Sequence, residues 1–445
     1  MTPIRVGLLG IGTVGSGTFR VLQRNCEEIR RRAGREIRIV TVADLDTERA
    51  RAVVGDAAQV VADARAVIAD PAIDLVVELI GGYGIARTLV LEAIAAGKHV
   101  VTANKALLAV HGNEIFAAAR DKGVTVAFEA AVAGGIPIIK ALREGLTANR
   151  IEWVAGIING TTNFILSEMR SKGLDFAVVL KQAQALGYAE ADPTFDIAGI
   201  DAAHKATIMS AIAFGVPVQF DKAYVEGIQA LQAVDIRYAE QLGYRIKLLG
   251  ITRRREHGIE LRVHPTLVPS SRLIASVEGA MNAVVVQGDA VGTTLYYGKG
   301  AGSEPTASAV IADLVDVTRL QTADPHHRVP HLAFQPGSLA DTPILPMEQV
   351  VTAFYLRLVV ADQKGVLASL TRILADNDIS IDAILQRPDA EGAGSAAPAA
   401  GEGKTDLIIL THDTVEGRMT QALAQMQALP TVLAPIVRIR KEELN

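Results

Sequence analysis

Short apolar runs alternate with amphipathic segments over the first third of the chain. Val, Ile and Leu dominate these runs, as in strands buried on both faces of a sheet, and the runs occupy residues 4–10, 37–43, 74–80 and 98–103. The segments between them carry apolar residues at helical spacing, and the first helix is expected to extend from residue 13 through 32. The alternation predicts a Rossmann-type, doubly wound parallel α/β sheet over residues 1–130.

A different pattern begins near residue 131. Polar and glycine residues gather at the ends of elements, and further strands are expected at 151–158, 259–268 and 282–289. We expect residues 131–303 to form an α+β substrate-binding and dimerisation domain, with a helix around 304–322 packing back on the first domain. These strands would form an open sheet, whose exposed face or edge a second copy of the chain would cover. A homodimer or homotetramer is therefore expected.

The C-terminal part follows a linker at 335–350 that contains three prolines. Residues 351–442 predict the order strand, helix, strand, strand, helix, strand, which is that of a ferredoxin-like βαββαβ unit. Small residues form an insert at 390–404, which we expect to be disordered.

Composition narrows the class of protein. A chain of 445 residues is too long for one core. Its net charge of -5 offers no basic face, so nucleic-acid binding is not expected. Charged residues such as Glu78 and Arg87 interrupt every long apolar run, and no membrane-spanning helix is expected. The single cysteine, Cys26, excludes an intramolecular disulfide and a Cys-rich zinc site, and the N-terminus lacks the pattern of a signal peptide. We expect a cytoplasmic protein.

A glycine-rich turn joins the first strand to the first helix. It contains Gly10, Gly12 and Gly15 in the order G-I-G-T-V-G. The first glycine permits the tight turn, the second lets a pyrophosphate approach the backbone, and the third lets the helix pack on the strand. The position at a strand-to-helix junction favours dinucleotide binding over an ordinary glycine-rich turn.

Asp44 follows the second strand, where an acidic side chain typically binds the adenosine ribose hydroxyls. This favours NAD over NADP, although Asp46 is a second candidate and nearby arginines could meet a 2'-phosphate. Ligands of such sheets bind at the carboxyl ends of the strands, so the later loops G-G-Y-G and T-A-N-K are expected to face the nicotinamide. Lys105, in the second of these loops, is either a site residue or an ordinary lysine at a helix start.

The most informative segment runs from residue 183 to 205. Acidic residues cluster in a proline-containing loop, and Asp201 and Lys205 follow four residues apart on one face of a helix. Apolar residues surround this pair on the helix, which indicates burial, and buried charges need a partner or a substrate. Lys205 is therefore a candidate proton donor, and structural pairing with Asp201 is the alternative.

These motifs together resemble homoserine dehydrogenase, specifically the long bacterial monofunctional type with a C-terminal ACT domain. The resemblance covers nearly the whole chain and rests on T-A-N-K, N-G-T-T-N-F-I-L-S, G-Y-A-E-A-D-P, the run from Ala183 to Lys205, V-H-P-T-L-V-P and G-A-G-S-E-P-T-A-S-A-V. It implies NAD(P)-dependent interconversion of L-homoserine and L-aspartate 4-semialdehyde, in the branch toward threonine, methionine and isoleucine.

The resemblance also implies roles for single residues. Lys205 corresponds to the proton donor, with Asp201 and Lys105 as its charged neighbours. The substrate would be bound by Glu190, Asp196, Thr161 and Lys105. The cofactor would be bound by Gly10, Gly12, Thr13, Val14, Gly15, Asp44, Thr102, Lys105, Gly187 and Gly302. Oxygens of Glu129, Val132, Gly134 and Ile136, mostly backbone carbonyls, would hold a sodium ion. Leu45 stands where members that prefer NADP often have arginine, which again favours NAD.

The C-terminal unit resembles an ACT domain in its D-x-x-G-V turn, with Asp362, Gly365 and Val366, and in Asn377 before the second strand. In the ACT family two paired domains bind amino acids at their interface, so the resemblance implies feedback inhibition by L-threonine. A dimerisation module or a purely structural module is the alternative.

Three hypotheses compete for the function of the whole chain, two of them enzymes and one a binding protein. Besides homoserine dehydrogenase, another NAD-linked oxidoreductase fits the first domain. Aspartate-semialdehyde dehydrogenase is set aside because it needs a cysteine nucleophile, and Cys26 falls in the first helix. A bifunctional aspartokinase fusion is not expected, because nothing precedes the first strand. A catalytically silent amino-acid sensor is disfavoured because it would have no reason to keep Lys205, Asp201, Glu190 and Lys105 together.

Overall fold

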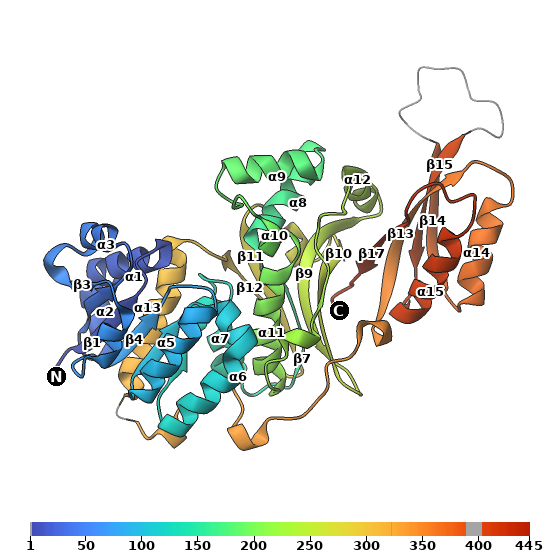
Figure 1. Ribbon diagram of the computed structural model, residues 1–445. Coiled ribbons are helices and arrows are strands. Elements are labelled where there is room, and N and C mark those ends of the chain that lie inside the picture. The colour runs from blue at the N-terminus through green and yellow to red at the C-terminus, as the bar shows by residue number, and fades with distance from the viewer. Residues whose placement is uncertain (1, 322, 389–402) are drawn as a thin grey trace.

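The computed structural model describes residues 2–321, 323–388 and 403–445. Three parts follow one another from the N-terminus to the C-terminal domain (Figure 1). The first is a parallel sheet with helices on its faces, the second is a mixed sheet covered by helices, and the third is a small βαββαβ unit. The predicted α/β class with a C-terminal ferredoxin-like domain is therefore confirmed. Among the described helices, none combines the length and the apolar character that crossing a membrane requires.

The N-terminal sheet has six parallel strands in the order β3-β2-β1-β4-β5-β6. Its strands are β1 (Ile4–Leu9), β2 (Ile37–Ala43), β3 (Gln59–Val61), β4 (Leu75–Glu78), β5 (His99–Thr102) and β6 (Val126–Ala127). The helices are α1 (Thr13–Arg24), α2 (Cys26–Ala33), α3 (Thr47–Val54), α4 (Ala64–Ala69), α5 (Gly84–Ala95) and α6 (Lys105–Lys122). The expected single helix from residue 13 through 32 is wrong, because Asn25 ends α1 and begins α2.

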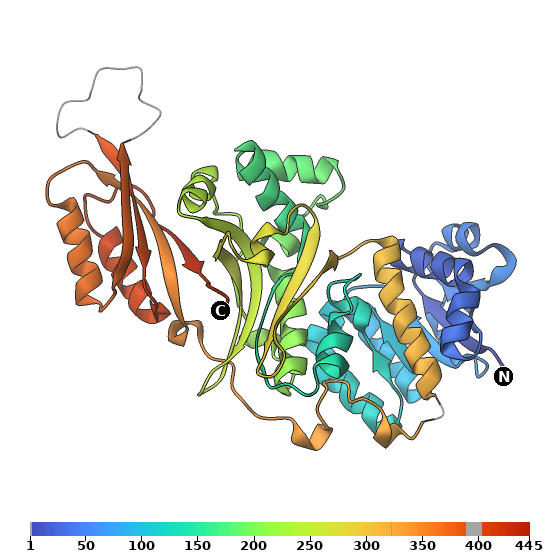
Figure 2. The ribbon, with the colours of Figure 1, turned by 180° about the vertical axis from the view of Figure 1, so that it is seen from behind.

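One helix from later in the chain returns to this domain. Helix α13 (Ser303–Leu320) packs against α1 and α2, and the two views agree on this (Figures 1 and 2). Its first residue donates a hydrogen bond from Ser303 Oγ to the carbonyl oxygen of Thr13, at 2.8 Å. Arg24 and Glu304 form an ion pair between α1 and α13. The start of α13 therefore lies at the glycine-rich turn.

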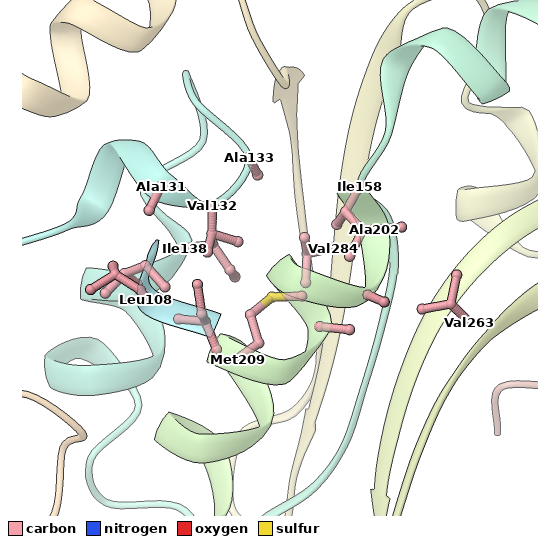
Figure 3. Close-up of a cluster of buried hydrophobic side chains, with 14 of the residues drawn as sticks. Leu108, Ala131, Val132, Ala133, Ile138, Ile158, Ala202, Met209, Val263 and Val284 are labelled. Atoms are coloured by element: carbon pink, nitrogen blue, oxygen red, sulfur yellow. The ribbon is translucent and has the colours of Figure 1, made fainter. Parts of the chain in front are cut away.

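The middle part is built on β7 (Ile151–Ile157), β8 (Tyr224–Val225), β9 (Tyr244–Arg254), β10 (Ile259–Pro269), β11 (Met281–Gly288) and β12 (Gly292–Lys299). Its helices are α7 (Ile138–Lys140), α8 (Gly160–Lys172), α9 (Phe176–Ala185), α10 (Thr194–Ile197), α11 (Ile200–Phe214) and α12 (Ala233–Gln241). Every residue of α11 from Asp201 to Phe214 is buried, which confirms the expected burial of this helix. Helix α11 packs between α6 and the sheet, and Figure 3 shows Met209 of α11 between Leu108 on one side and Val284 on the other.

The C-terminal domain contains β13 (Val351–Ala361), α14 (Val366–Asp376), β14 (Ile381–Pro388), β15 (Lys404–Thr411), β16 (Thr414–Val415), α15 (Glu416–Gln427) and β17 (Val437–Lys441). Its strands are ordered β17-β13-β15-β14, with both helices on one face. The predicted insert at 390–404 falls almost entirely outside the described residues.

The two sheets of the second and third parts are continuous. Strand β17 pairs in parallel with β10, through Thr266 with Arg440 and Leu267 with Lys441, and an 11-stranded sheet results. The expectation that a second copy of the chain covers the exposed edge is therefore wrong at β10, because the C-terminal domain of the same chain covers it. The expectation failed because nothing in the apolar pattern of β10 or β17 specifies this pairing. Strand β12 remains at the other end of the sheet.

Candidate active site

The glycine-rich turn is shaped to receive a phosphate. Gly10 has φ +95°, a conformation that favours glycine, and a Cβ at Gly15 would lie 2.1 Å from the carbonyl oxygen of Gly10. A Cβ at Gly12, the N-cap of α1, would meet nothing within 4 Å. The first turn of α1 carries no acidic residue. The open space at Gly12 and the amide groups of Thr13 and Val14 thus form a helix N-terminus suited to an anion.

Asp44 lies beside this turn. Its Oδ2 accepts a hydrogen bond from the amide of Ile11, at 2.7 Å, and its Oδ1 accepts one from the amide of Asp46, at 2.9 Å. Arg49 forms an ion pair with the same carboxylate, at 3.2 Å. Partial burial opposes ionisation, but these hydrogen bonds and the Arg49 charge lower the pKa of Asp44 below its usual value. Asp46, the alternative candidate, instead caps α3 through the amide of Arg49. Leu45 is 93% exposed.

The loops after β4 and β5 are held together by buried polar groups. Thr102 donates a hydrogen bond from Oγ1 to Glu78 Oε2, at 2.7 Å, and the other oxygen of Glu78 accepts from the amides of Ile80 and Gly81. Asn104 caps α6 by accepting from the amide of Leu107. This cap places Lys105 as the first residue of α6.

Three charged side chains meet at one buried carboxylate. Asp201 and Lys205 lie one turn apart on α11, and Lys205 Nζ donates to Asp201 Oδ2 at 2.6 Å. Lys105 Nζ lies 3.1 Å from the other oxygen, Asp201 Oδ1. Lys205 Nζ also donates to the carbonyl oxygen of Ile158, at 2.7 Å. These contacts use two of the three N–H groups of the Lys205 ammonium, so within the described residues the third is available to a substrate oxygen.

Asn159 connects this cluster to a second carboxylate. Its Nδ2 donates to Asp196 Oδ1 at 2.7 Å and to Asp201 Oδ2 at 2.8 Å, while its Oδ1 caps α8 through the amide of Thr162. The N-G-T-T-N motif was noted in the sequence, but Asn159 was not predicted to be a site residue. The cap position before a helix was the signal that could have found it. His204, which packs on Phe195 and Phe220 beside the cluster, was also missed.

Burial and charge shift the pKa values of these groups in different directions. Burial lowers the pKa of Lys205, although Asp201 opposes this. Burial alone would raise the pKa of Asp201, but Lys205 and Lys105 bring it well below its usual value. Burial and the Asp201 charge raise the pKa of Asp196. Burial lowers the pKa of His204 to about 4, so this ring is neutral. Within the described residues the cluster therefore contains the ion pair of Lys205 with Asp201 and a carboxyl, that of Asp196, with no salt bridge to a cation.

The two remaining substrate candidates, Thr161 and Glu190, and the cofactor candidate Gly187 lie in or beside the loop after α9. Thr161 donates from Oγ1 to the carbonyl oxygen of Tyr188, at 2.7 Å, and thereby joins α8 to this loop. Gly187, with φ +76°, follows Leu186, the C-cap of α9. Glu190 is exposed, and its backbone oxygen accepts a hydrogen bond from Gln184. The structure brings Asp196, Asp201, Lys205 and Lys105 together, and no contact of the Glu190 side chain with this cluster is seen within the described residues.

Glu129, the one predicted side-chain ligand of sodium, is buried in a different place. Its carboxylate accepts hydrogen bonds from the amides of Ile139 and Lys140, at 2.9 and 2.8 Å. Burial and the nearby Asp313 raise the pKa of Glu129 to about 7. Among the described residues, no three His, Cys, Asp or Glu side chains gather as they would around a transition metal. A carboxylate is an oxygen ligand of the kind that hard cations prefer, so this buried group has the chemical type expected at such a site.

Three sequence profiles match successive parts of the chain. The profile described as homoserine dehydrogenase, NAD binding domain, matches residues 10–129, the profile described as homoserine dehydrogenase matches residues 137–315, and the ACT domain profile matches residues 354–430. Their order agrees with the three parts of the fold.

Curated relatives match over the full length. A homoserine dehydrogenase of Pseudomonas aeruginosa is 61% identical, and one of Neisseria gonorrhoeae is 57% identical, with 100% of both chains covered in each case. A crystal structure of a homoserine dehydrogenase from Thiobacillus denitrificans is 67% identical, covers 100% of this chain and 99% of its own, and superposes with a TM-score of 0.94. A hyperthermophilic archaeal homoserine dehydrogenase solved with NADPH is 24% identical, covers 73% of this chain, has a TM-score of 0.62 and shares the fold.

Proposed function

The chain belongs to the homoserine dehydrogenase family, and we propose that Lys205 is its proton donor in the interconversion of L-homoserine and L-aspartate 4-semialdehyde. One observation carries the proposal: a buried ammonium, fixed by Asp201 Oδ2 at 2.6 Å and by the Ile158 carbonyl at 2.7 Å, with an N–H group left for a substrate oxygen. The same residues lie inside the segment matched by the family profile.

The protein has to orient the substrate and move one proton. The nicotinamide cofactor, when bound, supplies or accepts the hydride. In aldehyde reduction Lys205 donates its proton to the carbonyl oxygen of the semialdehyde, and in homoserine oxidation neutral Lys205 removes the hydroxyl proton. Asp201 holds the lysine in place and favours its charged form. Lys105, 3.1 Å from Asp201, adds a second positive charge near the developing alkoxide.

We assign the amino-acid end of the substrate to Asp196, Glu190 and Thr161. Asp196 has a raised pKa because it is largely buried and faces the negative Asp201. A substrate ammonium would supply the positive charge that Asp196 lacks. Glu190, exposed in the loop after α9, would reach the same ammonium from the solvent side.

For the cofactor we propose NAD in preference to NADP. Support comes from Asp44 beside the glycine-rich turn and from Leu45, which offers no charge to a 2'-phosphate. The residues proposed to hold the dinucleotide are Gly10, Gly12, Thr13, Val14, Gly15, Asp44, Thr102, Lys105, Gly187 and Gly302.

A sodium ion would be held by the Glu129 carboxylate together with backbone oxygens of Val132, Gly134 and Ile136. The raised pKa of Glu129 supports this, since a cation would stabilise its ionised form. Gly134 has φ +40°, and a Cβ there would lie 2.6 Å from the carbonyl oxygen of Gly300, so this loop depends on glycine.

We further propose that the ACT domain binds L-threonine and that the enzyme serves the branch toward threonine, methionine and isoleucine. A homodimer or homotetramer is the proposed assembly. Support comes from strand β12, an end strand of the sheet whose Leu295 and Tyr297 are exposed apolar side chains.

The test is the absorbance of reduced nicotinamide with purified protein and L-homoserine, with NAD or NADP in separate cuvettes, each repeated with L-threonine. We expect reduction of NAD, its loss in Lys205→Ala, and its inhibition by threonine. Lys181→Ala, on α9 outside the cluster, is the matched control and should keep full activity. Full activity in folded Lys205→Ala would contradict the assignment.

A further inference from the structure

A short segment, residues 224–228, packs against the turn that joins α10 to α11. The amide of Ile228 donates a hydrogen bond to the carbonyl oxygen of Ile197, at 2.9 Å. A Cβ at Gly227 would lie 2.2 Å from that same oxygen and 2.6 Å from Ala198 Cα. The backbones of the segment and the turn are therefore in direct contact, and neither can shift without the other.

This turn positions the two carboxylates of the site. Asp196 is the third residue of α10, and Asp201 is the second residue of α11. Between them Gly199 has φ +84°, and a Cβ there would lie 3.3 Å from Val225 and 3.4 Å from the carbonyl oxygen of Glu226. The separation of the two carboxylates thus depends on where residues 224–228 lie.

The ACT domain holds the other side of this segment. Arg440 of β17 is fully buried, and its Nη1 donates to Glu226 Oε2 at 2.8 Å. Its Nη2 contacts the hydroxyl of Tyr224 at 3.0 Å, and that hydroxyl donates to Glu226 Oε2 at 2.7 Å. Glu416, the first residue of α15, fixes the guanidinium from the opposite side through two hydrogen bonds of 2.8 and 2.6 Å. Arg440 therefore links α15 to residues 224–228 through charge-assisted bonds, which are buried on the Glu416 side and partly buried at Glu226.

The strand pairing supports the same link. Strand β8 pairs in parallel with β10, through Arg262 with Tyr224, and β10 pairs in parallel with β17. The amide of Glu226 donates to the carbonyl oxygen of Val263, at 2.8 Å. Backbone pairing with β10 sets the register of residues 224–226 along that strand. The Arg440–Glu226 ion pair holds the part of the segment that lies next to the α10–α11 turn.

We propose that Glu226 and Arg440 are positioning residues for the dehydrogenase reaction. Their ion pair keeps residues 224–228 against the α10–α11 turn, and the turn keeps Asp196 at the distance from Asp201 that the substrate ammonium requires. The inference rests on the proposed substrate role of Asp196. It assigns the C-terminal domain a part in substrate binding even in the absence of an effector.

The main test compares Glu226→Gln with Asp235→Asn in the full-length chain. Asp235 is the matched control, because it too is the acidic partner of a buried ACT arginine: it accepts from Arg357 Nε at 2.6 Å and from the Tyr355 hydroxyl at 3.1 Å. It lies on α12 rather than on residues 224–228. Each substitution removes one charge from an ion pair between the domains and leaves the size of the side chain almost unchanged.

We expect Glu226→Gln to raise the KM for homoserine about tenfold while the KM for the nicotinamide cofactor stays within twofold. Asp235→Asn should lower the unfolding temperature at least as much, because its carboxylate is fully buried, and leave the KM for homoserine within twofold. Equal effects of both variants on this KM, or an effect of Glu226→Gln on the unfolding temperature alone, would overturn the proposal. Arg440→Lys, which keeps the charge but loses the two-pronged contact, should raise the KM less than Glu226→Gln.

A double variant shows whether Glu226 acts through Asp196. In an Asp196→Asn background, Glu226→Gln should cause no further rise in the KM for homoserine, since the group it positions is already changed. Additive effects would overturn the positioning role and leave the proposed function intact. An unchanged KM in Asp196→Asn alone would contradict the substrate role of Asp196, and the inference with it.

Discussion

Asp201 determines the charge state of the candidate site, because two ammonium groups share its carboxylate. Lys205 and Lys105 lie 2.6 and 3.1 Å from its two oxygens. The negative charge raises the pKa of Lys205, against burial and against Lys105, which both lower it. With Lys205 in the proposed role of base, homoserine oxidation needs the neutral lysine, so the rate should rise with pH through the pKa of Lys205.

Asp201→Asn should move this rise to lower pH. The substitution removes the charge that favours the protonated lysine, so the neutral form appears at lower pH than in the parent enzyme. We also expect kcat to fall about a hundredfold, because the lysine loses its fixed position. The measurement is kcat/KM for homoserine between pH 6 and 10, with Asp192→Asn, in the exposed loop, as control. A flat profile in the parent enzyme, or a shift to higher pH in the variant, would contradict Lys205 as the base.

Asn159 is the residue through which two carboxylates share one amide. Asn159→Ala should raise the KM for homoserine, because Asp196 and Asp201 lose their common donor. It should also destabilise the chain by about 1–3 kcal/mol, since a helix cap and buried hydrogen bonds are lost. Denaturant unfolding and steady-state kinetics measure the two effects. Asp63→Ala removes another helix cap, at α4, and should cost about 1 kcal/mol without changing the KM.

Local spacing was enough to predict some of these residues and not others. Asp201 and Lys205 are four residues apart on an apolar helix, so their pairing and burial could be predicted from the sequence. The contact of Asn159 with Asp201 spans 42 residues, and that of Lys105 with Asp201 spans 96. No periodicity specifies such contacts. Lys105 was found through its strand-end loop and the family resemblance.

At the scale of elements, the connection between α13 and β13 contacts the first domain. The amide of Val126 donates to His331 Nε2 at 3.1 Å, and the amide of Thr125 donates to His99 Nδ1 at 3.0 Å. His331 also stacks on Phe116, with ring centroids 5.2 Å apart. Burial lowers the pKa of both histidines to about 4. Both nitrogens must stay unprotonated to accept these amides.

These histidines should make the fold sensitive to acid. Their folded-state pKa lies below the unfolded value of about 6.5, so their stabilising contribution is present above that pH and is lost as the pH falls toward about 4. For His331 alone the loss is on the order of 3 kcal/mol. His331→Gln should flatten the decline of unfolding free energy over this range, because glutamine does not titrate. Urea titrations at several pH values measure it, and exposed His257→Gln is the control. Parallel curves for His331→Gln and the parent would contradict this role.

The apolar pattern located strands reliably, but it did not locate the break between two successive helices. The run at 37–43 coincides with β2, and the predicted strand at 151–158 exceeds β7 by one residue. The break between α1 and α2 at Asn25 was missed, because apolar spacing continues across it: Leu22 and Ile29 are both buried. Asparagine disfavours a helix interior only weakly, so packing decides whether such a helix continues.

At the scale of the molecule, the pairing of β10 with β17 joins the middle part to the C-terminal domain. The βαββαβ order predicted the C-terminal domain, but its sheet partner could not be predicted, because an edge strand pairs equally well in many contexts. Several buried charges lie at this pairing. Arg262 of β10 is buried and pairs with Glu260 on its own strand and with Glu442 just after β17. Arg253 contacts the other oxygen of Glu442, at 3.3 Å.

Glu442→Gln should weaken this junction. The carboxylate is 4% exposed and receives two arginines, so removing its charge leaves buried positive charge partly unpaired. We expect a loss of about 3 kcal/mol in unfolding free energy, and a C-terminal domain that unfolds before the rest of the chain. Glu443→Gln is the matched control: Glu443 is 47% exposed, pairs with Lys441 at 3.4 Å, and its loss should cost less than about 0.5 kcal/mol.

Two probes distinguish the outcomes for Glu442→Gln. Fluorescence of Trp153, the single tryptophan, reports on β7 of the middle domain, and limited proteolysis reports on the C-terminal domain. In the parent enzyme both should change at one denaturant concentration, because a continuous sheet joins the two parts. In Glu442→Gln proteolysis should begin at lower denaturant than the fluorescence change. Coincident transitions with an unchanged midpoint would show that backbone pairing alone holds β17 to β10, since the buried charges would then add nothing to the junction.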